Sequence, residues 1–169
     1  MKSSIILIGL PGAGKTTIGS LLANELSLPF YDTDLLIEEK YQKKCSEIYK
    51  EVGGENFRAY EIEALQSLSS KTPSVISVGG GLPEIEGAFS LLDDLGICFY
   101  LHEEIDIVIN RRMQRPLPHF ARDWDHYRQS IIQRIPHYEN LADYVIECEN
   151  RSPQEIVLEI EGILNQLKT

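Results

Sequence analysis

Residues 9–16 read GLPGAGKT, which matches the G-x-x-x-x-G-K-[ST] spacing of a phosphate-binding loop. An apolar run precedes the segment and a helical pattern follows it, as that motif requires. Glycines in such a loop let backbone N–H groups point at phosphate oxygens, and the helix N-terminus adds positive charge. Lys15 is placed to reach the β- and γ-phosphates of ATP, and the Thr16 hydroxyl is a suitable Mg²⁺ ligand. A chance glycine turn with a lysine is the alternative, and the flanking elements argue against it.

Two carboxylates follow the next apolar run, in the segment Asp32-Thr33-Asp34. In an open parallel sheet, ligands bind beyond the carboxyl ends of the strands. Asp32 could therefore hold Mg²⁺, directly or through water. Asp34 could accept a hydrogen bond from an attacking hydroxyl and act as its base. The competing interpretation, strongest for Asp34, is a cap on the helix that starts near Leu35.

A glycine triplet and three arginines are the remaining candidates. The triplet, residues 79–81, ends a third apolar run and would allow close backbone approach to a ligand, although a tight turn explains it too. Arginines stand at positions 58, 115 and 134. Arginine suits anion recognition, but it also forms ordinary surface ion pairs, so none of the three is diagnostic alone.

The elements that must position these residues alternate along the chain. We expect strands at 5–10, 28–32, 74–78, 97–101 and 144–147, and helices after the glycine loop and at 35–41, 45–52, 57–68, 105–112, 124–138 and 153–167. The 124–138 helix should end or kink near Pro136. This alternation predicts one α/β domain with a parallel sheet. Residues 113–125 hold prolines and charges without periodicity, which predicts a mobile loop or lid.

The bulk composition limits the partners. The chain has 169 residues, 43% of them hydrophobic, and a formal net charge of −10, which disfavours nucleic acid and anionic membrane surfaces as partners. Its three cysteines are widely spaced and its four histidines show no metal-ligand spacing. We therefore expect a cytoplasmic location with free thiols.

These motifs together resemble the shikimate kinase family over nearly the whole chain. The resemblance rests on GLPGAGKTT at 9–17, DTD at 32–34, GGENFRAYE at 53–61, GGG at 79–81, RPL at 115–117 and R-x-P-x-Y at 134–138. It implies a three-layer P-loop NTPase fold with a central five-stranded parallel sheet, formed by residues 1–169 as a single domain. It also implies a substrate-binding helical region at about 33–61, a mobile lid at about 112–125, and a monomer.

The resemblance further implies transfer of a phosphoryl group from ATP to the 3-hydroxyl of shikimate, with Mg²⁺. Asp34, Lys15 and Arg115 would be catalytic, and Thr16 and Asp32 would hold the metal. The nucleotide would contact Gly12, Ala13, Gly14, Lys15, Thr16, Thr17, Arg111 and Arg115, with either Arg111 or Arg112 near adenine. Shikimate would contact Asp34, Arg58, Gly79, Gly80, Gly81 and Arg134.

Three departures from the family pattern and two alternatives stay open. Val78 precedes the glycine triplet where threonine is common. Pro118-His119-Phe120 follows RPL where leucine is common, which bears on lid geometry, and Glu139 stands where a basic residue is common. Another small-molecule P-loop kinase, of the gluconate or nucleoside monophosphate type, is the first alternative. The second is a nucleotide-dependent switch, which the absence of an N-K-x-D motif disfavours.

Overall fold

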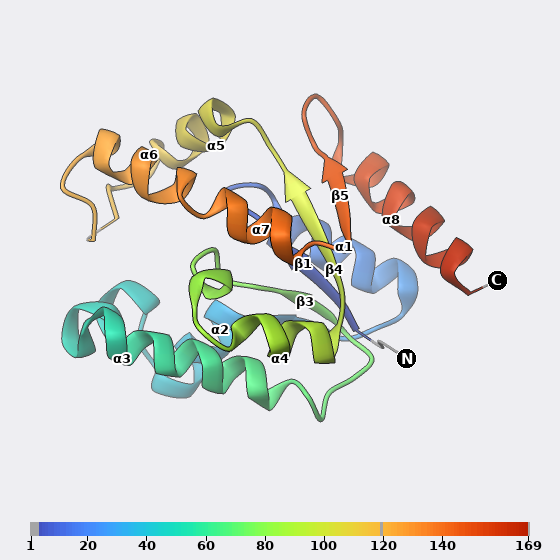
Figure 1. The fold of residues 1–169 in the computed structure, drawn as a ribbon, viewed down its shortest axis with the longest axis horizontal. Coiled ribbons are helices and arrows are strands. Elements are labelled where there is room, and N and C mark those ends of the chain that lie inside the picture. The colour runs from blue at the N-terminus through green and yellow to red at the C-terminus, as the bar shows by residue number, and fades with distance from the viewer. Residues whose placement is uncertain (1–3, 119, 169) are drawn as a thin grey trace.

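The computed structural model describes residues 4–118 and 120–168, and it shows a five-stranded parallel sheet with helices on both faces (Figure 1). The sheet order is β2-β3-β1-β4-β5. The strands are β1 (Ser4–Ile8), β2 (Phe30–Asp32), β3 (Val75–Ser77), β4 (Gly96–His102) and β5 (Tyr144–Glu147). The helices are α1 (Lys15–Leu26), α2 (Thr33–Tyr41), α3 (Cys45–Ser67), the short 3₁₀ helix η1 (Leu82–Glu84), α4 (Ala88–Leu95), α5 (Ile105–Arg112), α6 (Trp124–Ile132), α7 (Ile135–Leu141) and α8 (Pro153–Leu167). The predicted α/β fold is confirmed.

The central strand β1 separates two hydrophobic cores. Side chains alternate across a strand, so Ile5 and Leu7 face one side and Ile6 and Ile8 the other. The first pair packs with residues of α1 and α8, and the second with residues of α3, α4, α6 and α7. Because both faces are covered, β1 is buried along its whole length, as its continuous apolar sequence predicts.

The sheet topology brings the candidate residues to one edge. β1 lies between β3 and β4, with Leu7 in register with Ser77 on one side and Phe99 on the other. β2 pairs with β3 so that Asp32 lies beside Ser77. All these strands run in the same direction, so the segments that follow β1, β2 and β3 leave the sheet at the same edge.

A third, smaller core joins α2 to α3 through Ile37, Ile48 and Phe57. α3 consists of two helical stretches that meet at a non-helical residue, Gly53, at φ 80° and ψ 165°. A positive φ of this size is comfortable only for glycine. The predicted pair of helices, 45–52 and 57–68, is therefore present within α3, and the break lies at the predicted glycines.

The second half of the chain differs from expectation at two points. The predicted helix 124–138 is two helices, because α6 ends at Ile132 and α7 restarts at Ile135 with Pro136 in its first turn. Arg134 consequently caps the start of α7 instead of lying near the end of a longer helix. α4 was not predicted. None of the described helices is long and apolar enough to cross a bilayer.

Candidate active site

The loop between β1 and α1 has the backbone of an anion-binding turn. Gly12 and Gly14 adopt φ values of 90° and 97°, which a side chain would strain, and Gly14 is the N-cap of α1. No acidic residue stands in the first turn of α1, so the positive end of the helix dipole is not neutralised there. Ala13 is buried below the turn, whereas Thr16 and Thr17 are exposed at the helix start.

Lys15 lies folded against this loop. Its Nζ donates to the carbonyl oxygens of Gly9 at 2.7 Å and Leu10 at 2.9 Å, and the residue is only 9% exposed. Burial lowers the pKa of Lys15 to about 8, Asp34 and Asp32 oppose that shift, and Arg134 adds to it. A phosphate anion at this loop would therefore stabilise the charged form of the lysine.

Asp32 contacts both the loop helix and α2. Its Oδ2 accepts a hydrogen bond from the Thr16 hydroxyl at 2.9 Å, while its Oδ1 accepts from the backbone N–H of Asp34 and Leu35. Asp32, not Asp34, is thus the side chain that caps α2.

A hydroxyl and a carboxylate that meet beside a phosphate loop suit Mg²⁺, which takes few protein ligands together with substrate phosphates and water. The described residues contain no cluster of three or more histidine, cysteine or acidic side chains that could hold a metal ion. Thr16 and Asp32 therefore fit a shared protein–nucleotide magnesium site better than an all-protein one.

Asp34 lies in the first turn of α2 and lines a pocket beside the phosphate loop. Burial raises the pKa of its carboxyl to about 6, and the neighbouring carboxylates of Asp32 and Glu61 push it in the same direction. Such a pKa is well suited to a group that exchanges a proton near neutral pH.

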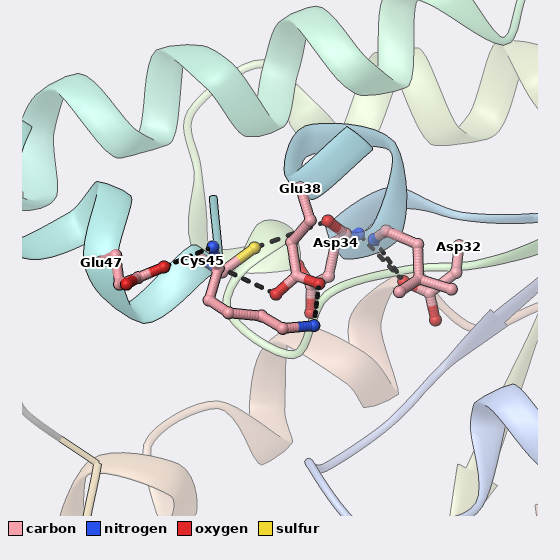
Figure 2. A network of polar contacts seen from close by, with 7 residues as sticks. Asp32, Asp34, Glu38, Cys45 and Glu47 are labelled. Carbon is pink, nitrogen blue, oxygen red and sulfur yellow. Dashed lines mark hydrogen bonds and ion pairs between the residues drawn. The ribbon is translucent and has the colours of Figure 1, made fainter. Parts of the chain in front are cut away.

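The start of α3 is tied to the helix that carries Asp34, as Figure 2 shows. Glu38 Oε1 accepts from the backbone N–H of Cys45 at 3.0 Å, and Lys44 Nζ lies 3.1 Å from Glu38 Oε2. The Cys45 thiol donates to the backbone oxygen of Asp34 at 3.5 Å. These contacts fix the distance between Asp34 and the residues of α3.

A pocket of about 580 Å³ lies beside the phosphate loop. Its walls come from Pro11 of the loop, from α2 and α3, from the glycine triplet, and from the segment after α5. Of the predicted residues, it is lined by Asp34, Arg58, Gly80, Gly81, Arg115 and Arg134. Gly79 does not line the pocket; its N–H donates to the Thr33 hydroxyl at 2.9 Å.

Each glycine of the triplet leaves room for a different side chain of the site. A methyl group on Gly79 would lie 2.7 Å from Asp34 Oδ1, and one on Gly81 would lie 2.6 Å from Arg58 Nη1. A methyl group on Gly80 would lie 3.2 Å from Arg134 Nη1. The groups that approach these glycines closely are side chains of the protein itself, and the close approach of a ligand to them stays a prediction.

Two of the arginines that line the pocket, Arg58 and Arg134, are each paired with a carboxylate that sequence reasoning missed. Arg58 Nη1 donates to Glu61 Oε2 at 2.7 Å, and Arg134 Nε lies 3.2 Å from Glu84 Oε2. Glu61 lies one helical turn after Arg58, so the i,i+3 spacing was a usable signal. No local spacing links Glu84 to Arg134, since they are 50 positions apart in the sequence.

Arg111 and Arg112, the last two residues of α5, contact different parts of the site. Arg111 Nη1 donates to the carbonyl of Gly12 at 3.0 Å, and its Nη2 donates to the buried Glu103 carboxylate at 3.1 Å. Arg112 instead donates to the carbonyl of Pro116 at 2.8 Å and lines the pocket. Arg111 is therefore on the phosphate-loop side, and Arg112 is on the pocket side.

The segment after α5 reaches across the pocket. Phe120 lies with its ring centroid 6.5 Å from that of Tyr49 in α3 and 6.0 Å from that of Tyr127 in α6. Trp124 packs edge-on against Tyr127, with centroids 5.7 Å apart. The atypical sequence Pro118-His119-Phe120 thus contributes an aromatic contact to α3, while His119 itself lies outside the described residues.

Comparison with known proteins gives a consistent result. The family model described as "Shikimate kinase" matches residues 11–165. The shikimate kinase of Corynebacterium glutamicum is 39% identical over 90% of this chain and 91% of its own, and that of Enterococcus faecalis is 38% identical over 98% of each.

Solved structures agree. Shikimate kinase from Acinetobacter baumannii, in complex with shikimate, superposes with a TM-score of 0.89 at 29% identity over 98% of this chain and 94% of that one. The enzyme from Aquifex aeolicus gives 0.83 at 33% identity over 96% of each. A gluconokinase from Sinorhizobium meliloti, at 0.68 and 19% identity over 98% of this chain and 93% of that one, shares the fold. The chain belongs to the shikimate kinase family, and it is a phosphotransferase that uses ATP as co-substrate.

Proposed function

We propose that this protein transfers the γ-phosphoryl group of Mg·ATP to the 3-hydroxyl of shikimate, which gives shikimate 3-phosphate and ADP for aromatic amino acid biosynthesis. The observation that carries this proposal is the convergence of Arg58, Arg134 and Asp34 in one pocket that adjoins the phosphate loop. Two guanidinium groups beside one carboxylate suit an acceptor that carries both an acid group and hydroxyls.

The nucleotide phosphates would lie in the turn formed by residues 9–17, against the start of α1 and Lys15. Arg111, which contacts the carbonyl of Gly12, would lie beside the base. Thr16 and Asp32 would hold Mg²⁺, which when bound supplies positive charge for the developing charge on the phosphate oxygens. Lys15, whose Nζ lies against the loop carbonyls of Gly9 and Leu10, would contribute charge of the same sign.

Arg58 and Arg134 would bind the shikimate carboxylate, with Gly80 and Gly81 beside them. Asp34 would accept a hydrogen bond from the reacting hydroxyl and take its proton as the phosphoryl group transfers. Because the pKa of Asp34 is about 6, the carboxylate is mostly ionised at neutral pH, as a base must be. Positioning then supplies most of the rate, since phosphoryl transfer needs little covalent help from protein.

The segment at about 112–125 would act as a lid, and Arg115 would contact the transferred phosphate from it. Among the described residues, the Arg115 side chain makes no ion pair, so its charge is available to a ligand. We further propose that residues 1–169 act as one kinase domain, with the substrate-binding helical region at about 33–61. The monomeric state and the cytoplasmic location stay predictions.

The direct test is ADP release from the protein with Mg·ATP, in the presence and absence of shikimate. We expect turnover that depends on shikimate, whereas gluconate and AMP should stay at the background rate. Turnover with gluconate or AMP in place of shikimate would overturn the proposal. ATP hydrolysis that no acceptor stimulates would support the nucleotide-dependent switch instead.

A further inference from the structure

Glu84 lies beside the pocket but has no part in the function proposed above. It ends the short helix η1, three residues after Gly81. Its Oε2 lies 3.2 Å from Arg134 Nε, and its side chain is 28% exposed against 10% for the arginine. A carboxylate this close to a nearly buried guanidinium must influence where that guanidinium points.

The contacts of Arg134 show which of its edges remains open. Nε is buried and donates no hydrogen bond within the described residues, so Glu84 meets that edge as an ion pair. The Nη1 end lies beside Gly80, which lines the pocket. Glu84 thus occupies the Nε edge and leaves the terminal nitrogens on the pocket side.

Glu84 differs from the other carboxylate of the site in where it comes from. Glu61 belongs to the same helix as Arg58, so that pair moves as one element. Glu84 belongs to η1 and Arg134 to the start of α7, so their contact fixes one element relative to another. The Tyr138 hydroxyl, which donates to the carbonyl of Gly80 at 2.5 Å, is a second link between α7 and the glycine triplet.

We propose that Glu84 is a positioning residue for recognition of the acceptor's carboxylate. It holds Arg134 by its Nε edge, so that the two terminal nitrogens face the pocket at the angle that bidentate pairing needs. Because Glu84 already restricts the Arg134 side chain in the folded protein, little side-chain entropy remains to be lost when the acceptor binds. This inference rests on the proposed function, because it assigns Glu84 a role through Arg134 and shikimate.

The test compares Glu84→Ala, Glu84→Gln and the matched control Glu86→Ala. Glu86 lies two residues on, is exposed, and makes no ion pair with the described part of the chain, so its loss changes the net charge equally. For Glu84→Ala we expect the KM and the equilibrium Kd for shikimate to rise about tenfold, equivalent to about 1.4 kcal/mol. The KM for ATP and kcat should stay within about twofold, as they should for Glu86→Ala.

Glu84→Gln keeps the side-chain length but removes the charge that pairs with Arg134 Nε, so it should weaken shikimate binding as Glu84→Ala does. In an Arg134→Ala background, Glu84→Ala should have no further effect, since it has nothing left to position. Three results would overturn the role: an unchanged KM in Glu84→Ala, an equal rise for ATP, or the same tenfold effect in the Arg134→Ala background. If the wild-type protein shows no shikimate-dependent turnover, the proposed function fails first, and the two failures are therefore distinct.

Discussion

Gly81→Ala tests whether the glycine triplet exists to make room for the arginines. A methyl group at this position would lie 2.6 Å from Arg58 Nη1 and 3.0 Å from Nη2, whereas ordinary contact begins at 3.4 Å. The obstructing atoms are the end of a flexible side chain, so the guanidinium should move away while the backbone stays in place. Gly81 has φ −88°, which alanine adopts freely, so no backbone strain is added.

The expected cost therefore falls on binding and not on folding. Restriction of the unfolded chain by alanine stabilises a protein by about 0.4–1 kcal/mol, which offsets a small rearrangement of Arg58. Loss of one charge-assisted contact to a carboxylate costs about 1.5–3 kcal/mol, or about 10- to 150-fold in affinity. Gly81→Ala should thus raise the KM for shikimate by at least about tenfold and leave both the Tm and the KM for ATP nearly unchanged.

The assay is steady-state ADP release with each substrate varied in turn, together with thermal unfolding. Gly162→Ala is the matched control, since this glycine lies within α8 and a methyl group there would meet nothing within 4 Å. Arg58→Ala should reproduce the effect of Gly81→Ala, and the double variant should be no worse than Arg58→Ala alone. A KM for shikimate within about twofold of wild type in Gly81→Ala would refute the steric reasoning.

Four other predictions concern the remaining parts of the site. Lys15→Ala should lower kcat by orders of magnitude, with a far-ultraviolet circular dichroism spectrum like that of the wild type; persistent activity would contradict the phosphate-loop assignment. Because Asp34 must be ionised to act as a base, kcat/KM for shikimate should fall about tenfold per pH unit below about pH 6, and Asp34→Asn should abolish this limb along with about 10²- to 10⁴-fold of the activity. The folded-state pKa of Asp34 lies above its ordinary value of 3.8, so its stabilising contribution is lost as pH rises from about 4 to 6; Asp34→Asn should accordingly raise the Tm more at pH 8 than at pH 4. Arg111→Ala should raise the KM for ATP more than that for shikimate, and Arg112→Ala should do the reverse; the opposite order in steady-state kinetics would exchange their assignments.

The sequence was most informative where function depends on local spacing. The phosphate loop and Asp32-Thr33-Asp34 each span the junction of a strand with the helix that follows it, so their geometry follows from neighbours in the chain. Strand periodicity located all five strands, and β5 agrees with its predicted bounds. No helix was predicted where α4 lies, over Ala88–Leu95.

What the sequence could not reveal depends on contacts between distant segments. The ion pair of Glu84 with Arg134 and the hydrogen bond of Arg111 with the Gly12 carbonyl join positions that no periodicity relates. The sequence alone does not say whether Arg111 or Arg112 lies nearer the phosphate loop, because the two residues are adjacent and of the same type. They differ in the contacts that each side chain makes, and only the structure shows these contacts. The cap of α2 is a second example. Asp32 and Asp34 are both of a residue type that caps helices, and only the hydrogen bonds to Asp32 Oδ1 show which of them does so.

The charge arrangement of the pocket explains how so acidic a chain could select one anion. Arg58 and Arg134 each face a carboxylate, so at long range they attract anions weakly, and the net charge of −10 adds repulsion. An anion then binds tightly only if its shape lets it accept hydrogen bonds from the guanidinium nitrogens of Arg58 and Arg134 that do not contact Glu61 or Glu84. Inorganic phosphate or a flexible acid would be repelled equally by the net negative charge, but its shape would not match the positions of these nitrogens. Arginines that are already paired with carboxylates therefore favour discrimination between anions over affinity for any anion. Arg115 makes no ion pair among the described residues and lines the pocket, so in the proposed function it would pair with the transferred phosphate.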